Sequence, residues 1–241
     1  MAVQSLGGKV ALVTGGSRGI GLAIARALVA DGARVAITAR SAAHLSAARP
    51  SIEAAGPGSV ETLQADVRRY DQIHRAVEAV VSRFGALHIL INNAGVGIFT
   101  DVASMTPEQW AEVVDTNLTG VFNACRAALP HMRGRGGAFI INISSLAGAN
   151  PFAGAAAYCA SKAGLNAFSE ALMQEVRYDD VRVSYVMPGS VATGFSSGDA
   201  AKGAEWKIRP EEVADVVLNL LRHDPRSLPS RVELRPSKPR K

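Results

Sequence analysis

Short runs of β-branched and apolar residues alternate with longer segments of helical periodicity along the whole chain. Seven such runs predict strands: Lys9–Thr14, Arg34–Thr38, Val60–Gln64, Ile89–Asn92, Ala138–Ile143, Arg182–Met187 and Arg231–Leu234. The intervening segments predict helices: Ile20–Asp31, Ala42–Ala55, Asp71–Phe84, Pro107–Met132, Ala156–Tyr178 and Pro210–Leu221. Strands separated by helical crossovers pair in parallel, with right-handed connections. The alternation therefore predicts an α/β fold, a Rossmann-type doubly wound parallel sheet of seven strands with helices on both faces.

The 241 residues contain no low-complexity linker and fit one domain over 1–241, with a basic tail at 236–241. The formal net charge is +5, and Lys238, Arg240 and Lys241 of the tail contribute much of it. No basic patch interleaved with aromatic residues accompanies that charge. We therefore expect a solvated tail and no nucleic-acid partner.

Cysteine, histidine and hydropathy patterns exclude several other classes. The two cysteines, Cys125 and Cys159, have no framework spacing, and the five histidines have no metal-ligand spacing. The N-terminus lacks the pattern of a signal peptide, and no apolar run approaches the roughly 20 residues of a membrane span. We expect a cytoplasmic protein without a metal site or a membrane partner.

A glycine-rich turn joins the first predicted strand to the first helix in the sequence TGGSRGIG. Glycines there permit a tight turn, bring backbone N–H groups close to a diphosphate and let the helix pack on the strand. The strand before the turn and the helix after it make an unoccupied tight loop the weaker alternative. The predicted dinucleotide contacts in this turn are Gly15, Ser17, Arg18, Gly19, Ile20 and Gly21.

The second predicted strand ends in Thr38-Ala39-Arg40, where an NAD site usually offers a carboxylate to the adenosine ribose. No acid stands there. Arg40 and Arg18 are instead suited to charge-assisted bonds with a 2′-phosphate, which favours NADP. The alternative is that either arginine merely points into solvent.

The third predicted strand is followed by Asp66 and Val67. Asp66 is placed to accept a hydrogen bond from an adenine amino group, with Val67 beside it. A turn or capping role for Asp66 is almost as plausible.

Tyr158 and Lys162 are four residues apart in a helical pattern and so share one helix face. A tyrosine with an ordinary pKa of about 10 is a poor acid or base at pH 7, and a nearby ammonium with a cationic nicotinamide favours the phenolate. Ser145 ends the run FIINISS just after the fifth predicted strand, where its hydroxyl can bind a substrate oxygen. Asn117 is an awkward residue for a helix interior and a candidate for a water or backbone contact.

These residues, in this order, resemble the classical short-chain dehydrogenase/reductase family, in particular its NADP-preferring carbonyl and 3-oxoacyl reductases. The resemblance covers about Gly8 to Leu234. It implies a catalytic tetrad of Asn117, Ser145, Tyr158 and Lys162. It also implies further cofactor contacts, from Asn93, Ala94 and Gly95 of the NNAG motif, and from Pro188, Gly189, Val191 and Thr193 after the sixth strand.

The resemblance implies a mechanism as well. Ser145 orients the carbonyl, hydride comes from the nicotinamide, and Tyr158 protonates the alkoxide that forms. Lys162 lowers the pKa of the tyrosine and holds the ribose, and Asn117 holds a water that links Lys162 to solvent. Ser144 then faces elsewhere as a structural residue.

The predicted activity is reversible, NADPH-dependent reduction of a ketone or aldehyde, of ketone, β-keto ester or 3-oxoacyl type. Two alternatives stay open: an NAD-dependent alcohol dehydrogenase, and a non-catalytic NADP-binding sensor. The expected partners are a small carbonyl or alcohol substrate and other copies of the chain, in a homodimer or homotetramer. The ending LPSRVELRPSKPRK lacks the Asp-Gly-Gly motif of many relatives, which puts the usual tetramer contacts in doubt.

Overall fold

The computed structural model describes residues 5–134, 136–195 and 204–239. All seven predicted strands form, and they pair in parallel in the order β3-β2-β1-β4-β5-β6-β7. Residues 196–203, between the sixth strand and the last helix, and the last two residues of the predicted basic tail lie outside the described residues. The strands are β1 (Val10–Thr14), β2 (Arg34–Ala39), β3 (Ser59–Gln64), β4 (Ile89–Asn92), β5 (Ala138–Ile143), β6 (Val181–Pro188) and β7 (Arg231–Leu234).

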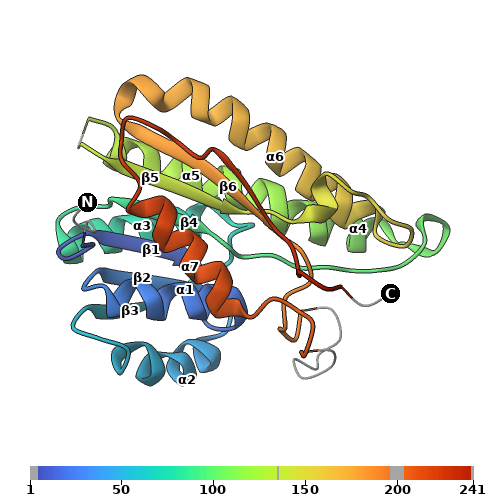
Figure 1. Cartoon of the computed structure of the whole chain (residues 1–241), viewed down its shortest axis with the longest axis horizontal. Helices are drawn as coiled ribbons and strands as arrows, with labels where there is room; N and C mark the ends of the chain where they lie inside the picture. The colour runs from blue at the N-terminus through green and yellow to red at the C-terminus, as the bar shows by residue number, and fades with distance from the viewer. Residues whose placement is uncertain (1–4, 135, 196–203, 240–241) are drawn as a thin grey trace.

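Helices cover both faces of the sheet, so the predicted doubly wound architecture is confirmed (Figure 1). One face carries the helices α1 (Gly19–Ala30), α2 (Ala42–Glu53) and α7 (Pro210–Leu221). The other face carries α3 (Tyr70–Phe84), α5 (Gly120–Met132) and α6 (Ala156–Val176), with α4 (Pro107–Val114) packed against α6.

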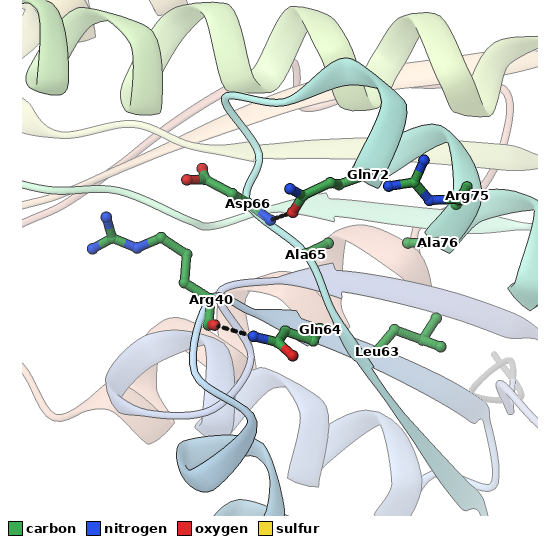
Figure 2. A pocket seen from close by; sticks show the side chains of 8 residues that line it. All are labelled: Arg40, Leu63, Gln64, Ala65, Asp66, Gln72, Arg75 and Ala76. Carbon is green, nitrogen blue, oxygen red and sulfur yellow. Dashed lines mark hydrogen bonds between the residues drawn. The ribbon is translucent and has the colours of Figure 1, made fainter.

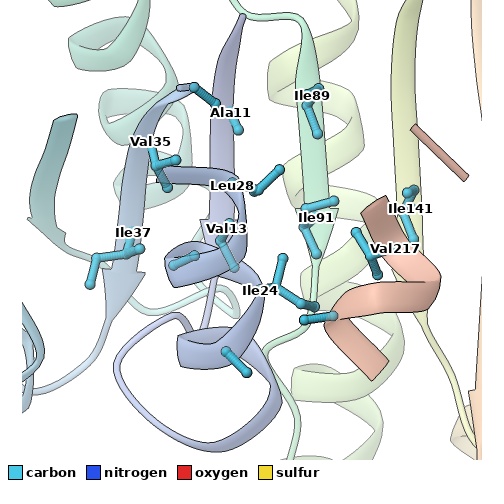
Figure 3. Close-up of a cluster of buried hydrophobic side chains, with 14 of the residues drawn as sticks. Ala11, Val13, Ile24, Leu28, Val35, Ile37, Ile89, Ile91, Ile141 and Val217 are labelled. Atoms are coloured by element: carbon cyan, nitrogen blue, oxygen red, sulfur yellow. The ribbon is translucent and has the colours of Figure 1, made fainter. Parts of the chain in front are cut away.

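The core consists of two apolar layers, one on each face of the sheet. Alternate residues of β1 serve different layers: Ala11 and Val13 face α1, whereas Val10 and Leu12 face α3 and α5. Figure 3 shows the first layer, in which Ile24 of α1 meets Val217 of α7 over the sheet. Burial on both sides explains why the central strands are apolar almost throughout.

The segment predicted as a single helix over Pro107–Met132 differs from that prediction. A π-helical turn over Asp115–Thr119 separates α4 from α5. This turn widens the helix where Asn117, which is fully buried, must reach a neighbouring segment. Single π-helical turns inside α-helices are often found at functional sites.

The carboxyl ends of the parallel strands lie at one edge of the sheet, where ligands of open α/β sheets usually bind. In Figure 1 the described residues between β6 and α7, 189–195 and 204–209, lie at the same end of the molecule as the C-terminus, opposite the N-terminus. In the parts of the chain that the structure describes, no helix combines the length and apolar character needed to cross a bilayer.

Candidate active site

A cavity of about 980 Å³ opens at the carboxyl ends of the strands. Its walls come from the glycine turn, the ends of β2 to β6 and the start of α6. Nearly all the residues predicted from the sequence line it: Gly15, Ser17, Arg18, Gly19, Ile20, Arg40, Asp66, Val67, Asn93, Ala94, Gly95, Ser145, Tyr158, Lys162, Pro188, Gly189, Val191 and Thr193. Two predicted residues, Gly21 and Asn117, lie behind the wall.

The glycine turn needs glycine for two different reasons. Gly15 and Gly19 have φ angles of 64° and 55°, in the left-handed region that other residues rarely adopt. Gly21 needs close approach instead, because a Cβ there would lie 2.3 Å from Nδ2 of Asn93 and 2.4 Å from the carbonyl oxygen of Gly15. The turn thus brings backbone N–H groups to the cavity at the start of α1, where the helix dipole favours an anion.

The NNAG segment holds this turn in place. Asn93 donates from Nδ2 to the carbonyl oxygens of Thr14 (3.0 Å) and Gly15 (3.1 Å). The Thr14 hydroxyl in turn accepts from the backbone N–H groups of Asn93 and Ala94, at 3.0 and 3.2 Å. The ends of β1 and β4 therefore form one rigid support under the cofactor end of the cavity.

Arg18 and Arg40 line the same cavity, at the end of the glycine turn and the end of β2. The Arg40 side chain is about half exposed, and its one ion pair within the described residues is a long one with Glu112, 3.7 Å between Nη1 and Oε1. Exposed pairs of this kind contribute little, so the guanidinium is available to an anionic ligand.

Asp66 lies beside Arg40, and Figure 2 shows both side chains reaching past the ends of β2 and β3 on the same side. The structure adds a partner that the sequence did not reveal. Arg68 binds the Asp66 carboxylate with both Nε and Nη2, the latter at 2.6 Å. This hydrogen-bonded ion pair is the main reason why the pKa of Asp66 lies below its usual value.

Beyond this pair a smaller hollow of about 570 Å³ continues between the ends of β2 and β3 and the helix α3. Its walls include Arg40, Asp66 and Gln72, and the side chain of Gln72 accepts from the backbone N–H of Asp66 at 2.9 Å. The Asp66 carboxylate also accepts from the backbone N–H of Arg68 at 3.0 Å, so it serves the turn after β3, which was the alternative interpretation of this residue.

Ser145 and Tyr158 meet in the wall of the cavity. Ser145 follows β5 and caps a short 3₁₀ turn, since its hydroxyl accepts from the N–H of Ala147 at 3.1 Å. Tyr158 lies in the first turn of α6 and is hydrogen-bonded to Ser145. Burial raises the pKa of the Tyr158 phenol, and the bond with Ser145 acts in the opposite direction.

Lys162 is one turn further along α6, and its side chain is almost completely buried. Its ammonium donates to the carbonyl oxygen of Ile143 at 2.8 Å and lies 5.9 Å from the centroid of the Tyr158 ring. Burial lowers the pKa of Lys162 to about 8. The two residues share one face of the helix, as their spacing predicted.

Asn117 lies behind this pair and is fully buried. Its amide accepts from the N–H of Val96 at 2.8 Å and donates to the carbonyl oxygen of Val96 at 2.9 Å. It also donates to the hydroxyl of Ser161 at 3.0 Å. The expected backbone contact is thus present, while the water relay implied by the resemblance stays a prediction.

A buried polar network that the sequence analysis missed lies beside the site. The Asn92 side chain donates to Asn142 (2.8 Å), which donates to Ser169 of α6 (2.8 Å). Ser144 joins α6 in the same way, through Asn166 at 2.5 Å. The Ser144 hydroxyl thus has the expected structural role, although Ser144 also lines the cavity. Together these bonds fix α6 on the strands β4 and β5. Polar residues within apolar strands are the signal that would have found the network.

The segments after β6 complete the cavity. Gly189 donates its N–H to the carbonyl oxygen of Leu234 at 2.8 Å, and the Thr193 side chain lies against Gly19. Val191 pairs with Ile208 in an isolated bridge. The tail begins as part of this wall rather than as a purely solvated end, because Pro236 packs on Gly189 and lines the cavity.

Aromatic side chains line the cavity on the Tyr158 side. They are Phe99, Phe152, Phe195 and Trp206. Phe99 and Phe152, which sequence reasoning missed, lie in irregular segments after β4 and β5, and large apolar residues in such segments are the available signal. Among the described residues, no cluster of three or more histidine, cysteine, aspartate or glutamate side chains is placed to hold a metal.

Comparisons with known proteins agree with this geometry. The profile of the short chain dehydrogenase family matches residues 9–202. A 3-dehydrosphinganine reductase of Arabidopsis thaliana is 42% identical over 203 residues, which are 83% of this chain and 58% of that protein, so the chain spans less than two thirds of this relative. An acetoacetyl-CoA reductase of Paracoccus denitrificans is 39% identical over 227 residues, 90% of this chain and 91% of that protein.

Among solved structures, a metagenomic short-chain oxidoreductase in complex with NADP is 41% identical. It superposes with a TM-score of 0.85 over 98% of this chain and 100% of that one. The glycine turn, the Ser145–Tyr158–Lys162 cluster and these matches lead to one conclusion: the chain belongs to the short-chain dehydrogenase/reductase family of oxidoreductases.

Proposed function

We propose that the protein reduces a ketone or aldehyde to an alcohol with NADPH, reversibly, and that Tyr158 is the general acid and base. One observation carries the proposal. The Tyr158 phenol is hydrogen-bonded to Ser145, has the Lys162 ammonium behind it, and shares a single cavity with the glycine turn and two arginines.

The residues present fit a nicotinamide dinucleotide. A Cβ at Gly21 would collide with Asn93, and one at Gly15 would lie 2.8 Å from Cα of Ala94, so both glycines keep the turn closed to side chains and open to a diphosphate. Thr38 and Thr116 line the cavity and have buried hydroxyls without a hydrogen-bond partner among the described residues. Buried polar groups of this kind usually meet a ligand or water.

Each end of the cavity has its own task. Arg18, Arg40 and the start of α1 would hold the phosphates, including a 2′-phosphate, and Asp66 with Val67 would contact the adenine. Asn93, Ala94, Gly95, Pro188, Gly189, Val191 and Thr193 would line the nicotinamide half. When bound, the cofactor supplies a hydride to the carbonyl carbon.

The chain's own residues handle the oxygen and the proton. Ser145 and Tyr158 both donate hydrogen bonds to the carbonyl oxygen, and Tyr158 gives its proton to that oxygen as negative charge develops there. The Lys162 ammonium stabilises the phenolate that remains. Burial alone raises the pKa of Tyr158, so the role of this tyrosine as an acid and base depends on the positive charge of Lys162.

The relatives support this activity class. Two of them are named as reductases of carbonyl substrates, and a solved relative is a complex with NADP. An NAD-dependent alcohol dehydrogenase would retain the same Ser145–Tyr158–Lys162 cluster but has no use for Arg40. A non-catalytic NADP-binding sensor would need the glycine turn but not the cluster.

The test is oxidation of NADPH, followed at 340 nm, against a panel of ketones, aldehydes and β-keto esters. We expect turnover by the wild type, a loss of roughly 10³-fold or more in Tyr158→Phe, and a lower KM for NADPH than for NADH. Equal rates in the wild type and Tyr158→Phe would contradict the catalytic role. A lower KM for NADH would contradict the cofactor assignment, and NADPH binding without turnover would favour the sensor.

A further inference from the structure

The side of the cavity around Tyr158 is lined by phenylalanine rings from three separate segments. Phe99 follows β4, Phe152 precedes α6, and Phe195 follows β6. The Phe99 ring meets the Tyr158 ring edge to face, with centroids 5.6 Å apart, and the Phe195 ring is 5.8 Å from Tyr158 on a tilted plane. Phe152 stacks on Phe99 at 6.3 Å. We call Phe99, Phe152 and Phe195 the aromatic clamp.

These rings are not ordinary core residues. Phe99, Phe152 and Phe195 are 41%, 55% and 44% exposed, although all three line the cavity. Exposed apolar surface is unfavourable in water. An apolar part of a ligand can therefore be buried against these three rings, beside the reactive phenol. The clamp therefore forms a binding surface beside the group that reacts.

The backbone is adapted to the clamp. Gly97 lies against both Phe99 and Phe195, and a Cβ at this position would be 2.8 Å from Phe195 and 2.9 Å from Phe99. Any side chain at Gly97 would push the two rings apart. The absence of a side chain lets rings from two distant segments approach the same point.

The chemistry of the clamp selects one kind of substrate. Aromatic rings prefer edge-to-face or offset contacts with other rings at centroid distances of roughly 4.5–7 Å, and these contacts add to simple apolar burial. A carbonyl bonded to Ser145 and Tyr158 places its substituent beside the Tyr158 ring, between rings already set at such distances. A saturated ring of similar size fills the same space without the quadrupole interaction.

We infer that the preferred substrate is a ketone with an aromatic ring close to its carbonyl, and that Phe99, Phe152 and Phe195 set this preference. The inference rests on the proposed function, because it assumes that Tyr158 protonates a carbonyl oxygen. It adds the substrate class and three specificity-determining residues.

The experiment compares two ketones with the same groups next to the carbonyl carbon, phenylacetone and cyclohexylacetone, with butanone as a small reference. We expect kcat/KM for phenylacetone to exceed that for cyclohexylacetone by about tenfold, through a lower KM, as one or two aromatic contacts would produce. In Phe99→Leu, Phe152→Leu and Phe195→Leu the ratio should fall to about threefold or less.

Tyr178→Leu is the matched control. This tyrosine is 92% exposed and lies 20 residues after Tyr158, just beyond the far end of α6 and roughly 30 Å away along the helix. The substitution removes an aromatic ring outside the cavity, so the ratio of kcat/KM for phenylacetone to kcat/KM for cyclohexylacetone should stay at its wild-type value. A drop in this variant as large as in the clamp variants would overturn the assignment of specificity to the clamp.

The outcomes separate the two proposals. If the wild type reduces butanone but treats phenylacetone and cyclohexylacetone alike, the substrate inference is wrong and the proposed function stands. A kcat/KM for acetoacetyl-CoA well above that for phenylacetone would also overturn the inference. If no ketone or aldehyde oxidises NADPH, the proposed function fails and the substrate inference fails with it.

Discussion

The active site contains a buried charged residue, Lys162, and burying a charge lowers the stability of the folded protein. Lys162 is 5% exposed, and among the described residues its ammonium donates to the carbonyl oxygen of Ile143. A pKa of about 8 in place of the ordinary 10.5 corresponds to roughly 3 kcal/mol, at about 1.4 kcal/mol per pH unit. The folded protein therefore gives up stability at neutral pH to keep a cation behind Tyr158.

This cost predicts a pH-dependent gain from Lys162→Met. Below pH 8 the wild type must bury a charged lysine, and above about pH 10.5 the lysine is neutral in both the folded and the unfolded state. The variant should therefore be more stable at pH 7, by up to roughly 3 kcal/mol. That advantage should shrink as the pH rises from 8 to 10.5.

Urea unfolding of both proteins at pH 7, 8, 9 and 10 measures the difference. Lys238→Met, on the exposed tail, is the control for loss of a lysine without burial. An advantage of Lys162→Met that grows with pH would contradict the explanation.

A second prediction concerns Arg40. Arg40→Ala removes the guanidinium proposed to bind the 2′-phosphate, so KM for NADPH should rise roughly tenfold, as expected for one charge-assisted bond at a partly exposed site. KM for NADH should stay within about twofold.

Steady-state kinetics with both cofactors test this. Arg49→Ala is the matched control, since Arg49 is an exposed arginine of α2 that pairs with Glu53 at 2.7 Å. Equal effects of Arg40→Ala on both cofactors would contradict selection for the 2′-phosphate.

At the scale of elements, the site depends on how helices are fastened to strand ends. The π-helical turn between α4 and α5 lets Asn117 reach the backbone of Val96, while Asn92, Asn142 and Ser169 tie β4 and β5 to α6. Hydrogen bonds between buried polar groups favour one arrangement of the elements around them. Tyr158 and Lys162 are held in place because α6 cannot slide along the sheet.

Asn117→Leu should therefore destabilise the fold strongly. The substitution leaves the N–H and the carbonyl of Val96 without their partner, at about 1–3 kcal/mol each, so a loss of roughly 2–6 kcal/mol is expected. Chemical denaturation with urea measures it. Asn219→Leu, at an exposed position of α7, replaces a helical asparagine and should change stability by less than about 1 kcal/mol. Similar losses in the two variants would show that Asn117 does no more than an ordinary helical asparagine.

At the scale of the whole molecule, the segments after β4, β5 and β6 bring the reactive tyrosine and three phenylalanine rings to one end of a cavity whose other end carries the arginines. The outer surface also keeps large apolar residues exposed on neighbouring helices, with Trp110 of α4 at 44% and Phe122 of α5 at 45%. Exposed aromatic residues of this size are enriched where proteins associate.

We therefore predict a homodimer or homotetramer in which Phe122 is buried. Light scattering coupled to gel filtration should give two or four times the 25.2 kDa chain mass for the wild type, and a smaller species for Phe122→Glu. Tyr178→Glu places the same charge on another exposed aromatic residue and should leave the mass unchanged. A monomeric wild type would contradict the prediction.

The sequence alone determined the sheet of seven parallel strands, the glycine turn and the spacing of Tyr158 and Lys162. These features are local, because strand and helix periodicity, left-handed glycine angles and a four-residue spacing all depend on residues close together in the sequence. The long helix predicted over Pro107–Met132 failed at Asn117, since a π-helical turn there depends on a partner 21 residues away. Local periodicity contains no information about such a bond.

Only the tertiary structure decided what surrounds those residues. Three contacts depend on how loops and strand ends converge: the carbonyl oxygen of Ile143 with Lys162, the network through Asn142, and Phe99 between Phe152 and Tyr158. The pKa of Lys162 likewise follows from burial, which a sequence pattern does not specify. The catalytic residues could be named from their order along the chain, but the surface that would choose the substrate exists only once distant segments fold together.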